Sequence, residues 1–531
     1  MTTIRRIYAY LLSFAGLAML TIASANLGQL VVDVFLRSPV VSERYVRDTA
    51  SLYGAAALVG LPAWLLHWLW IQRSARSDSS ERASVLRRVY LYAVLAGATL
   101  VAAVSLADVM RNALGALLGV PPSGPVPDAI LRPLPFTIVA LCVWFPHLRV
   151  TTQDRLSVGE AGGSASLRRW YTYGAALIGF LVMLSGTRGL ADAIWRAAAG
   201  ASLGPLAPSV AAAASAALIG LGLWLAHWVV LPRRLGPGAR DEDGTAVLRT
   251  VYLFLALAIA VVATLGGLSE LLYYSVARML GVEAPGGVGG DLLQAAAEPA
   301  TTALVYGGAW AYQRAALRQH AAMYHEAPRQ AGIRRLYTHI VALVALAALA
   351  TGVSGLLWML GDLVLASASM LAGNAWREQV ALFATMTVVG LPVWVLHWRA
   401  RPASEDDSHA LARRLYLYLS LIVAALTLIG SAAAALYRLL GLALGGSFGT
   451  DVATDLAHAL AVATVAVAVG AYHWRALQWD TRRARVEAAR PAAQEECVAE
   501  SVVVEIRAGN GASLADALNA LRATGVEVTI R

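Results

Sequence analysis

Five histidines recur near the ends of apolar segments, and they are the side chains with the most evident capacity for chemistry. They are His67, His147, His227, His397 and His473. Histidine is the commonest metal ligand and can ligate haem, so one histidine per segment could hold a row of pigments. The alternative is a belt of amphipathic rings at the lipid headgroups, beside arginine and phosphate. We favour the belt, because the histidines lie within a few residues of helix ends and Gln313 interrupts the series.

Acidic residues inside the apolar segments form a second candidate site. Ionisable groups within a membrane mark ion or proton paths by default. Asp108 and Glu270 lie toward one end of their segments, where snorkelling or a nearby arginine such as Arg111 also explains them. Glu298, followed by Pro299, is placed nearer the middle of a span, where proline frees a backbone carbonyl beside the carboxylate. A candidate polar path therefore comprises Glu298, Glu270 and Asp108.

The motifs of familiar enzymes are missing from the sequence. It contains no P-loop, no glycine-rich dinucleotide turn, no nucleophile motif and no His-Glu-x-x-His. Cys142 and Cys497 are the only cysteines, too few for a disulfide framework or a zinc cluster. We therefore expect a protein that is not an enzyme and carries no metal or cofactor.

The composition indicates a membrane protein. Of 531 residues, 58% are hydrophobic and 14% charged, and the mean hydropathy is +0.61. A soluble protein carries roughly 25% charged residues, so lipid must be the solvent for much of this chain. All 42 basic residues are arginine, and we interpret the net charge of +9 as membrane-flanking charge rather than as a nucleic-acid-binding surface. The first apolar run, about residues 7–36, is too long for a cleavable signal peptide and predicts a signal anchor.

A repeated motif positions the histidines. Arg-Arg-x-Tyr opens five segments and an altered form opens a sixth, and the six openings are spaced almost evenly along the chain. The openings are Arg5-Arg6-Ile7-Tyr8, Arg87-Arg88-Val89-Tyr90, Arg168-Arg169-Trp170-Tyr171, Arg249-Thr250-Val251-Tyr252, Arg334-Arg335-Leu336-Tyr337 and Arg413-Arg414-Leu415-Tyr416. Such a regular period is typical of an array of similar units.

Each unit contains two apolar runs, and the second closes on Trp-x-x-His or a variant of it, as at Trp64–His67 and Trp394–His397. Both runs approach or exceed the length of roughly 20 residues that a helix needs to span a membrane. We therefore expect an all-α polytopic protein with twelve transmembrane helices in six parallel two-helix repeats. The membrane domain covers residues 1–478, with repeats at about 4–75, 85–150, 166–231, 247–316, 332–400 and 411–477.

The arginines predict the orientation. Of the 42, 32 lie at the N-terminus, between units or in the C-terminal tail, and 10 lie within units. Positively charged segments stay on the cytoplasmic side, so both termini are expected inside the cytoplasmic (inner) membrane of the cell. Units one and five share Gly-Leu-Pro-x-Trp, at Gly60 and Gly390, which the even units lack. This alternation suggests three four-helix blocks.

These motifs are similar to those of a bacterial multi-pass membrane repeat, domain of unknown function 5671. The resemblance rests on Arg-Arg-x-Tyr-x-Tyr and on the closing Gly-Leu-Pro-x-Trp-x-x-His-Trp, and it covers roughly residues 4–477. It implies a membrane location and no assigned activity. Unit four departs most from the pattern, with Thr250 and Gln313 at motif positions.

The C-terminal tail differs in composition. Residues 479–498 predict a helical extension and linker, and residues 499–531 a small α/β module of βαβ type. The module has strands at 501–507 and 526–531 around a helix that Ser513 begins. It is shorter than the roughly 40 residues that usually fold unaided. We therefore expect it to bind a protein partner or a second copy of the chain.

The leading functional hypothesis is a non-enzymatic membrane scaffold or sensor, with lipids around its helices and a cytoplasmic docking tail. One alternative is a transporter or channel, since twelve crossings are common there, although such proteins generally place polar groups at mid-membrane. A second alternative is a subunit that binds haem or pigment through the histidines.

Overall fold

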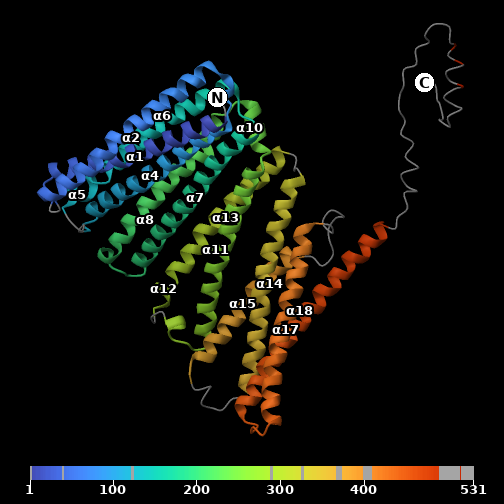
Figure 1. Ribbon diagram of the computed structural model, residues 1–531. Helices are drawn as coiled ribbons and strands as arrows, with labels where there is room; N and C mark the ends of the chain where they lie inside the picture. The colour runs from blue at the N-terminus through green and yellow to red at the C-terminus, as the bar shows by residue number, and fades with distance from the viewer. Residues whose placement is uncertain are drawn as a thin grey trace. The chain divides into compact units, whose positions relative to one another are not determined.

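The structure is a computed structural model that describes residues 3–38, 41–120, 125–287, 291–324, 328–365, 373–398 and 410–488, together with Ser513, Ala515 and Asn519. The chain divides into two compact units, residues 1–474 and 475–531. The described parts of the first unit are helices joined by short turns, as the all-α prediction requires (Figure 1).

Long helices dominate the first unit and are joined by short ones. The long helices are α1 (Thr3–Phe35), α2 (Glu43–Ser77), α4 (Val85–Leu117), α6 (Leu134–Val158), α7 (Gly162–Ala198), α8 (Leu203–Trp224), α11 (Val247–Met279), α13 (Ala297–Met323), α14 (Pro328–Leu365), α15 (Ala375–His397), α17 (Leu411–Ala443) and α18 (Thr450–Ala488). The short ones are α3 (Ser79–Arg82), α5 (Val126–Leu131), η1 (Leu225–Val230), α9 (Leu231–Arg233), α10 (Pro237–Gly244), η2 (Pro285–Gly287) and α12 (Leu292–Ala295).

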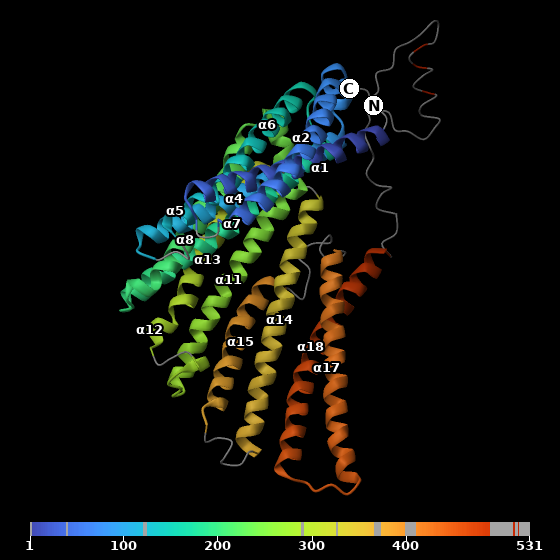
Figure 2. The ribbon, with the colours of Figure 1, turned by 60° about the vertical axis from the view of Figure 1, so that its left-hand side comes forward.

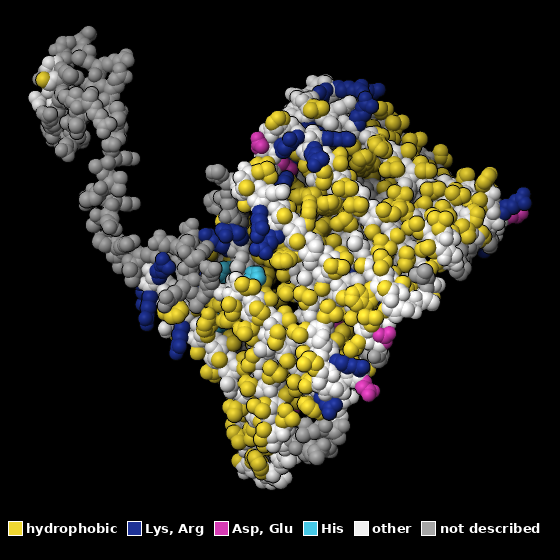
Figure 3. Space-filling model, turned by 180° about the vertical axis from the view of Figure 1, so that it is seen from behind, with side chains coloured by type: hydrophobic (Ala, Val, Ile, Leu, Met, Phe, Trp, Pro, Cys, Tyr) yellow, Lys and Arg dark blue, Asp and Glu magenta, His cyan; other side chains and the backbone are white. Residues whose placement is uncertain are grey.

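Within the described ranges, 11 helices are long and apolar enough to cross a membrane, as in a multi-pass membrane protein. The long helix outside that set is α13. Large apolar side chains are exposed on the molecular surface. For example, Leu58, Leu304 and Leu396 are 77%, 72% and 77% exposed. Figure 3 shows hydrophobic side chains over most of the described surface of one face, with arginine concentrated near its rims. A surface this apolar is suited to lipid and not to water.

The long helices pack as successive pairs, here called hairpins one to six: α1/α2, α4/α6, α7/α8, α11/α13, α14/α15 and α17/α18. The end of each hairpin that carries the Arg-Arg-x-Tyr opening is its motif end, and the other is its far end. The first helix of a hairpin packs on the next hairpin, for example α1 on α6 and α4 on α8. The hairpins follow one another in chain order in both ribbon views (Figures 1 and 2).

Small residues let the two helices of the odd hairpins approach closely. Gly60, Gly220 and Gly390 each lie seven residues before the motif histidine of their hairpin. A Cβ atom there would lie 2.9 Å from Leu20 N, 2.2 Å from Met183 N and 2.8 Å from Leu349 N, respectively. Helices in lipid associate through such contacts, because small side chains let backbones meet. The even hairpins carry Ala140, Tyr306 and Ala466 at the equivalent positions, which accounts for the alternating hairpin types.

The predicted tail lies almost entirely outside the described residues. Ala515 and Asn519 are helical, in the stretch for which a helix is predicted. The strands predicted at 501–507 and 526–531 and most of the linker lie outside the described part of the chain. The helix α18 extends into the predicted linker as far as Ala488.

Candidate functional site: polar clusters between hairpins

The motif histidines, tyrosines and tryptophans form hydrogen-bonded chains that join neighbouring hairpins. In hairpin three, Tyr171 Oη lies 3.0 Å from His227 Nε2 and accepts from Trp144 Nε1 of hairpin two at 3.1 Å. In hairpin six, Tyr416 Oη lies 2.9 Å from His473 Nε2 and accepts from Trp394 Nε1 of hairpin five at 2.9 Å. These motif residues therefore connect hairpin three to hairpin two and hairpin six to hairpin five.

The geometry fixes the protonation pattern of these histidines. In all five, Nδ1 faces the backbone carbonyl four residues earlier, at 2.6–2.9 Å. A carbonyl only accepts, so Nδ1 carries the proton and Nε2 is left to accept from the tyrosine hydroxyl. His147, His227 and His473 are buried and have both nitrogens engaged in this way. These three rings have no nitrogen left to bind a metal, haem or pigment.

The other two histidines are only half-buried. His67 and His397 contact Tyr8 and Tyr337 through ring edges, with centroids 5.6 Å and 6.5 Å apart. Hairpin five, which carries His397, borders the large cavity described below. The three buried motif histidines thus pack between repeats, and the headgroup belt stays a prediction from the sequence.

A second cluster lies beside these chains at the motif ends, where a carboxylate accepts from both motif elements of the hairpin before it. Glu81 accepts from Arg6 Nε at 2.8 Å and from Tyr10 Oη at 2.9 Å. Asp243 repeats the arrangement with Arg169 Nε at 2.9 Å and Tyr173 Oη at 2.6 Å. Both carboxylates are almost fully buried. Buried charges of this kind are tolerated only when paired and hydrogen-bonded.

Glu160 joins hairpins two and three through the same geometry. It lies 3.3 Å from Arg88 Nη1 and accepts from Tyr92 Oη at 2.9 Å, both in hairpin two. It also accepts from Arg168 Nε of hairpin three at 2.8 Å. A neighbouring buried pair links Arg87 Nε to Asp154 at 2.6 Å. Five arginines of the motif are therefore structural cations whose charge is neutralised inside the protein: Arg6, Arg87, Arg88, Arg168 and Arg169.

Asp243 lies outside the candidate spans, in α10, and its electrostatics can be stated directly. Burial alone would raise the pKa of its carboxyl group. The charge of Arg168 and the hydrogen bonds from Tyr173 and Arg169 outweigh burial, so the pKa of Asp243 lies below its ordinary value.

Sequence reasoning missed these loop acids, although a signal was present. Glu81 and Asp243 each precede the next motif arginine by six residues, and Glu160 does so by eight. An acid at a nearly fixed distance before the motif openings of hairpins two, three and four was the available clue.

A contact between an acidic and a basic side chain recurs at the far end in each successive pair of hairpins. Asp33 Oδ1 lies 2.7 Å from Arg132 Nε, and Asp362 Oδ1 lies 2.5 Å from His458 Nε2. Asp33 and Asp362 occupy equivalent positions, counted from the motif tyrosines of hairpins one and five. Arg132 and His458 also occupy equivalent positions, counted from the motif histidines of hairpins two and six. At these two positions hairpins three and four carry Arg196 and Glu298, so the signs are exchanged. Arg196 itself pairs with Asp192 of its own helix, with Nε 2.8 Å from the carboxylate.

This pattern changes the interpretation of Glu298. The structure places it in the first turn of α13, and not near the middle of a span as the sequence suggested. Pro299 follows in the same turn, where helix N–H groups have no intrahelical partner, so no hydrogen bond is lost. Glu298 pairs with Arg188 Nη1 at 3.1 Å and is 63% exposed. It is the sign-exchanged member of the far-end pairs.

The other members of the candidate polar path have separate partners. Asp108 pairs with Arg111 on its own helix at 2.9 Å, and both are about half exposed. Glu270 accepts from Tyr274 Oη at 2.8 Å and borders an apolar cavity. Within the described residues, no group of three or more His, Cys, Asp or Glu side chains could hold a metal ion.

The fold and these contacts define a class: an α-helical, multi-pass membrane protein built from internal repeats that interlock through polar clusters. A family model, Domain of unknown function (DUF5671), matches residues 6–144, 169–309 and 335–468. The chain belongs to this family, as the motifs predicted, and each match spans two successive hairpins. The three matches also confirm the internal triple repeat. No curated protein and no solved structure is significantly similar to the chain.

Proposed function

We propose that the protein is a non-enzymatic scaffold or sensor of the inner membrane, with twelve crossings and both termini in the cytoplasm. The observation that carries the proposal is the use of the motif residues in contacts between hairpins. Buried His147, His227 and His473 and the acids Glu81, Glu160 and Asp243 all take part in the clusters that join neighbouring repeats. Side chains used in this way stabilise a fixed array and are not free for a reaction.

The positions and partners of the acidic residues weaken the transporter hypothesis. Transport sites generally lie near mid-membrane at broken helices. Glu298 instead lies in the first turn of its helix and pairs with Arg188, and Asp108 pairs on its own helix. Equal substrate flux in proteoliposomes with and without the protein is therefore the expected result.

The twelve crossings require α13 to span the membrane beside the 11 candidate helices. Its contacts with α11, like those within the other hairpins, support this arrangement. The test is labelling with a membrane-impermeant maleimide in a variant without Cys142 and Cys497. Glu283→Cys should react in intact cells, and Gln319→Cys only after permeabilisation. Reaction of both from the same side would contradict the crossing.

The docking role of the tail is tested by truncation. The full chain and a chain ending at residue 498 are purified in parallel and their assembled masses measured by light scattering and native mass spectrometry. We expect the full chain to form a defined assembly, with itself or with a stoichiometric partner, and the truncated chain to lose it with unchanged thermal unfolding. Identical masses would refute the docking role.

A further inference from the structure

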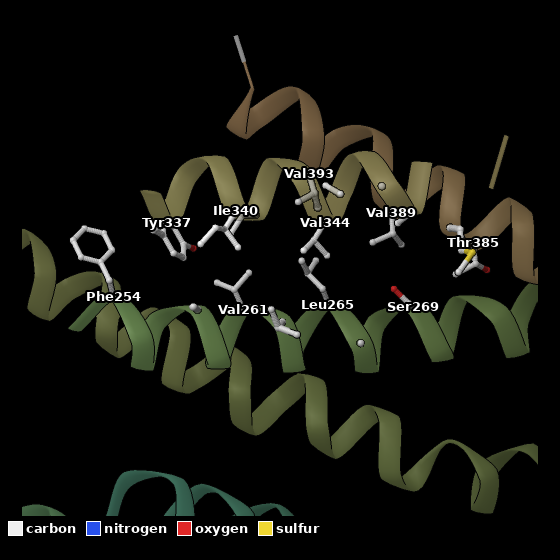
Figure 4. A pocket seen from close by; sticks show the side chains of 18 of the residues that line it. Phe254, Val261, Leu265, Ser269, Tyr337, Ile340, Val344, Thr385, Val389 and Val393 are labelled. Carbon is white, nitrogen blue, oxygen red and sulfur yellow. The ribbon is translucent and has the colours of Figure 1, made fainter. Parts of the chain in front are cut away.

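A large apolar cavity separates hairpins four and five. Its volume is about 870 Å³, and α11, α14 and α15 line it. The lining of α11 runs from Val251 to Tyr273, a length of about 33 Å at ~1.5 Å per residue, comparable to the hydrocarbon thickness of a bilayer. Figure 4 shows Val261 and Leu265 of α11 facing Ile340 and Val344 of α14 across the space.

A second cavity of about 330 Å³ lies at the motif end of the same junction. Phe254 lines both cavities, so they adjoin. The polar lining of the smaller one is cationic or neutral: Arg318, His320, Arg334, Thr250 and Tyr324. None of its lining residues is acidic. Arg318 lines it and makes no ion pair with another described residue.

Thr250 supplies an independent observation that points to a ligand. Its side chain is 3% exposed, lines the smaller cavity, and its hydroxyl has no hydrogen-bond partner among the described residues. A buried hydroxyl without a partner costs roughly 1–3 kcal/mol, so a ligand that accepts from it is favoured. The Thr385 hydroxyl, in the wall of the larger cavity, is also buried without a partner in the described chain.

We propose that these two adjoining cavities bind one glycerophospholipid with an anionic headgroup. The acyl chains lie along α11 against α14 and α15, and the phosphate lies at Arg318 and Arg334 and accepts from the Thr250 hydroxyl. Arginine matches phosphate geometry with two parallel donors. Basic pockets between transmembrane helices on the cytoplasmic side suit anionic headgroups. The proposal rests on the membrane location and is independent of the scaffold role.

The test uses the full chain in mild detergent, with lipid binding followed by native mass spectrometry. Dioleoyl phosphatidylglycerol is compared with dioleoyl phosphatidylcholine, which has the same chains and no net charge. We expect the anionic lipid to bind at least about tenfold more tightly. Arg318→Gln should weaken that binding about fivefold, since one arginine near an anionic lipid is worth about a factor of five. Arg73→Gln, an exposed arginine of α2, is the matched charge control and should leave binding unchanged.

A second pair of variants tests the groove itself. Ala258→Trp fills the large cavity, and Ala96→Trp is placed at the equivalent position of α4, in the smaller cavity between hairpins two and three. Ala258→Trp should abolish lipid binding while Ala96→Trp leaves it intact, with thermal unfolding showing that both variants are folded. Equal binding of the two lipids, no effect of Arg318→Gln, or full binding by Ala258→Trp would each overturn the proposal. A bound protein at this junction in place of lipid would also overturn it.

Discussion

The junction between hairpins two and three and the junction between hairpins four and five occupy equivalent places in the repeat, but they are held differently. At the first, Thr99 and Trp144 bond Tyr171, and Arg88 and Tyr92 bond Glu160. At the second, the positions of Arg88, Tyr92 and Thr99 carry Thr250, Phe254 and Val261. Three polar anchors are thus lost on one helix.

The consequence is visible in the packing. The apolar cavity at the first junction is about 360 Å³, and at the second it is about 870 Å³. In hairpin two, Asp154 neutralises Arg87. The equivalent residue of hairpin four, at the second junction, is His320. A few substitutions within one repeat therefore convert a tighter contact into a more open one that is lined by basic side chains. The comparison teaches that the positions where one repeat departs from the motif indicate a candidate binding site better than the recurrent motif residues do.

The largest expected effect comes from removing the carboxylate at the closed junction. Glu160→Gln leaves Arg88 and Arg168 buried beside a neutral amide and should lower the free energy of unfolding by about 3–5 kcal/mol. Denaturant titration of the purified protein measures the change. The control is Asp48→Asn, whose pair with Arg44 is largely exposed and should matter by less than about 0.5 kcal/mol. Equal effects would show that the buried cluster does not hold the junction.

Asp243, between hairpins three and four, sharpens the comparison through pH. Because its folded pKa lies below its ordinary value, its contribution to stability is complete above about pH 4, the range of the unfolded carboxyl group. That contribution is lost as the pH falls through the lowered folded pKa. Asp243→Asn should cost about 2–4 kcal/mol at pH 7, and the difference from the natural chain should shrink on acidification. A difference that stays constant from pH 7 to about 3 would contradict the assignment.

A matched pair of tyrosines compares the two junctions directly. Tyr171→Phe removes the hydroxyl shared by Thr99, Trp144 and His227 and should cost about 1–2 kcal/mol. Tyr337→Phe, at the equivalent position of the open junction, removes a hydroxyl with no hydrogen bond to another described residue. It should cost less than about 0.5 kcal/mol. Thermal unfolding of both variants in one detergent checks the ranking, and a reversed ranking would refute it.

The smallest expected effect comes from restoring part of the closed junction. Val261→Thr places a hydroxyl at the position of Thr99, facing the cavity beside Tyr337. A new hydrogen bond between them should raise the free energy of unfolding by about 1 kcal/mol. Val262→Thr, one residue along α11, is the matched control and should give no gain. Stabilisation by both variants would assign the effect to composition and not to the tyrosine.

The sequence was sufficient for the helical repeat and its period, because apolar runs and Arg-Arg-x-Tyr are local patterns. The family and its triple repeat were also predicted and are confirmed by the three matches. The count of twelve crossings stays a prediction, since α13 carries Arg314 and Arg318 and is less apolar than its counterparts.

The role of the motif side chains could not be read from local sequence. His227 resembles a headgroup residue by its place near a helix end, but its tyrosine partner Tyr171 belongs to the other helix of the hairpin and is distant in the chain. Glu298 looked central because the break before α13 cannot be located from an apolar run. Aligning Gln313 with the motif histidines of hairpins two and six places Glu298 at the position of Arg132 and His458. This alignment would have identified Glu298 as a far-end charge.

The most direct test is an experimental density map of the full chain in nanodiscs that contain phosphatidylglycerol. We predict elongated density between α11 and α14/α15 that ends in a headgroup at Arg318 and Thr250, with the junction between hairpins two and three closed and Tyr171 bonded to His227. Closed packing at both junctions, or lipid density at both, would contradict the account.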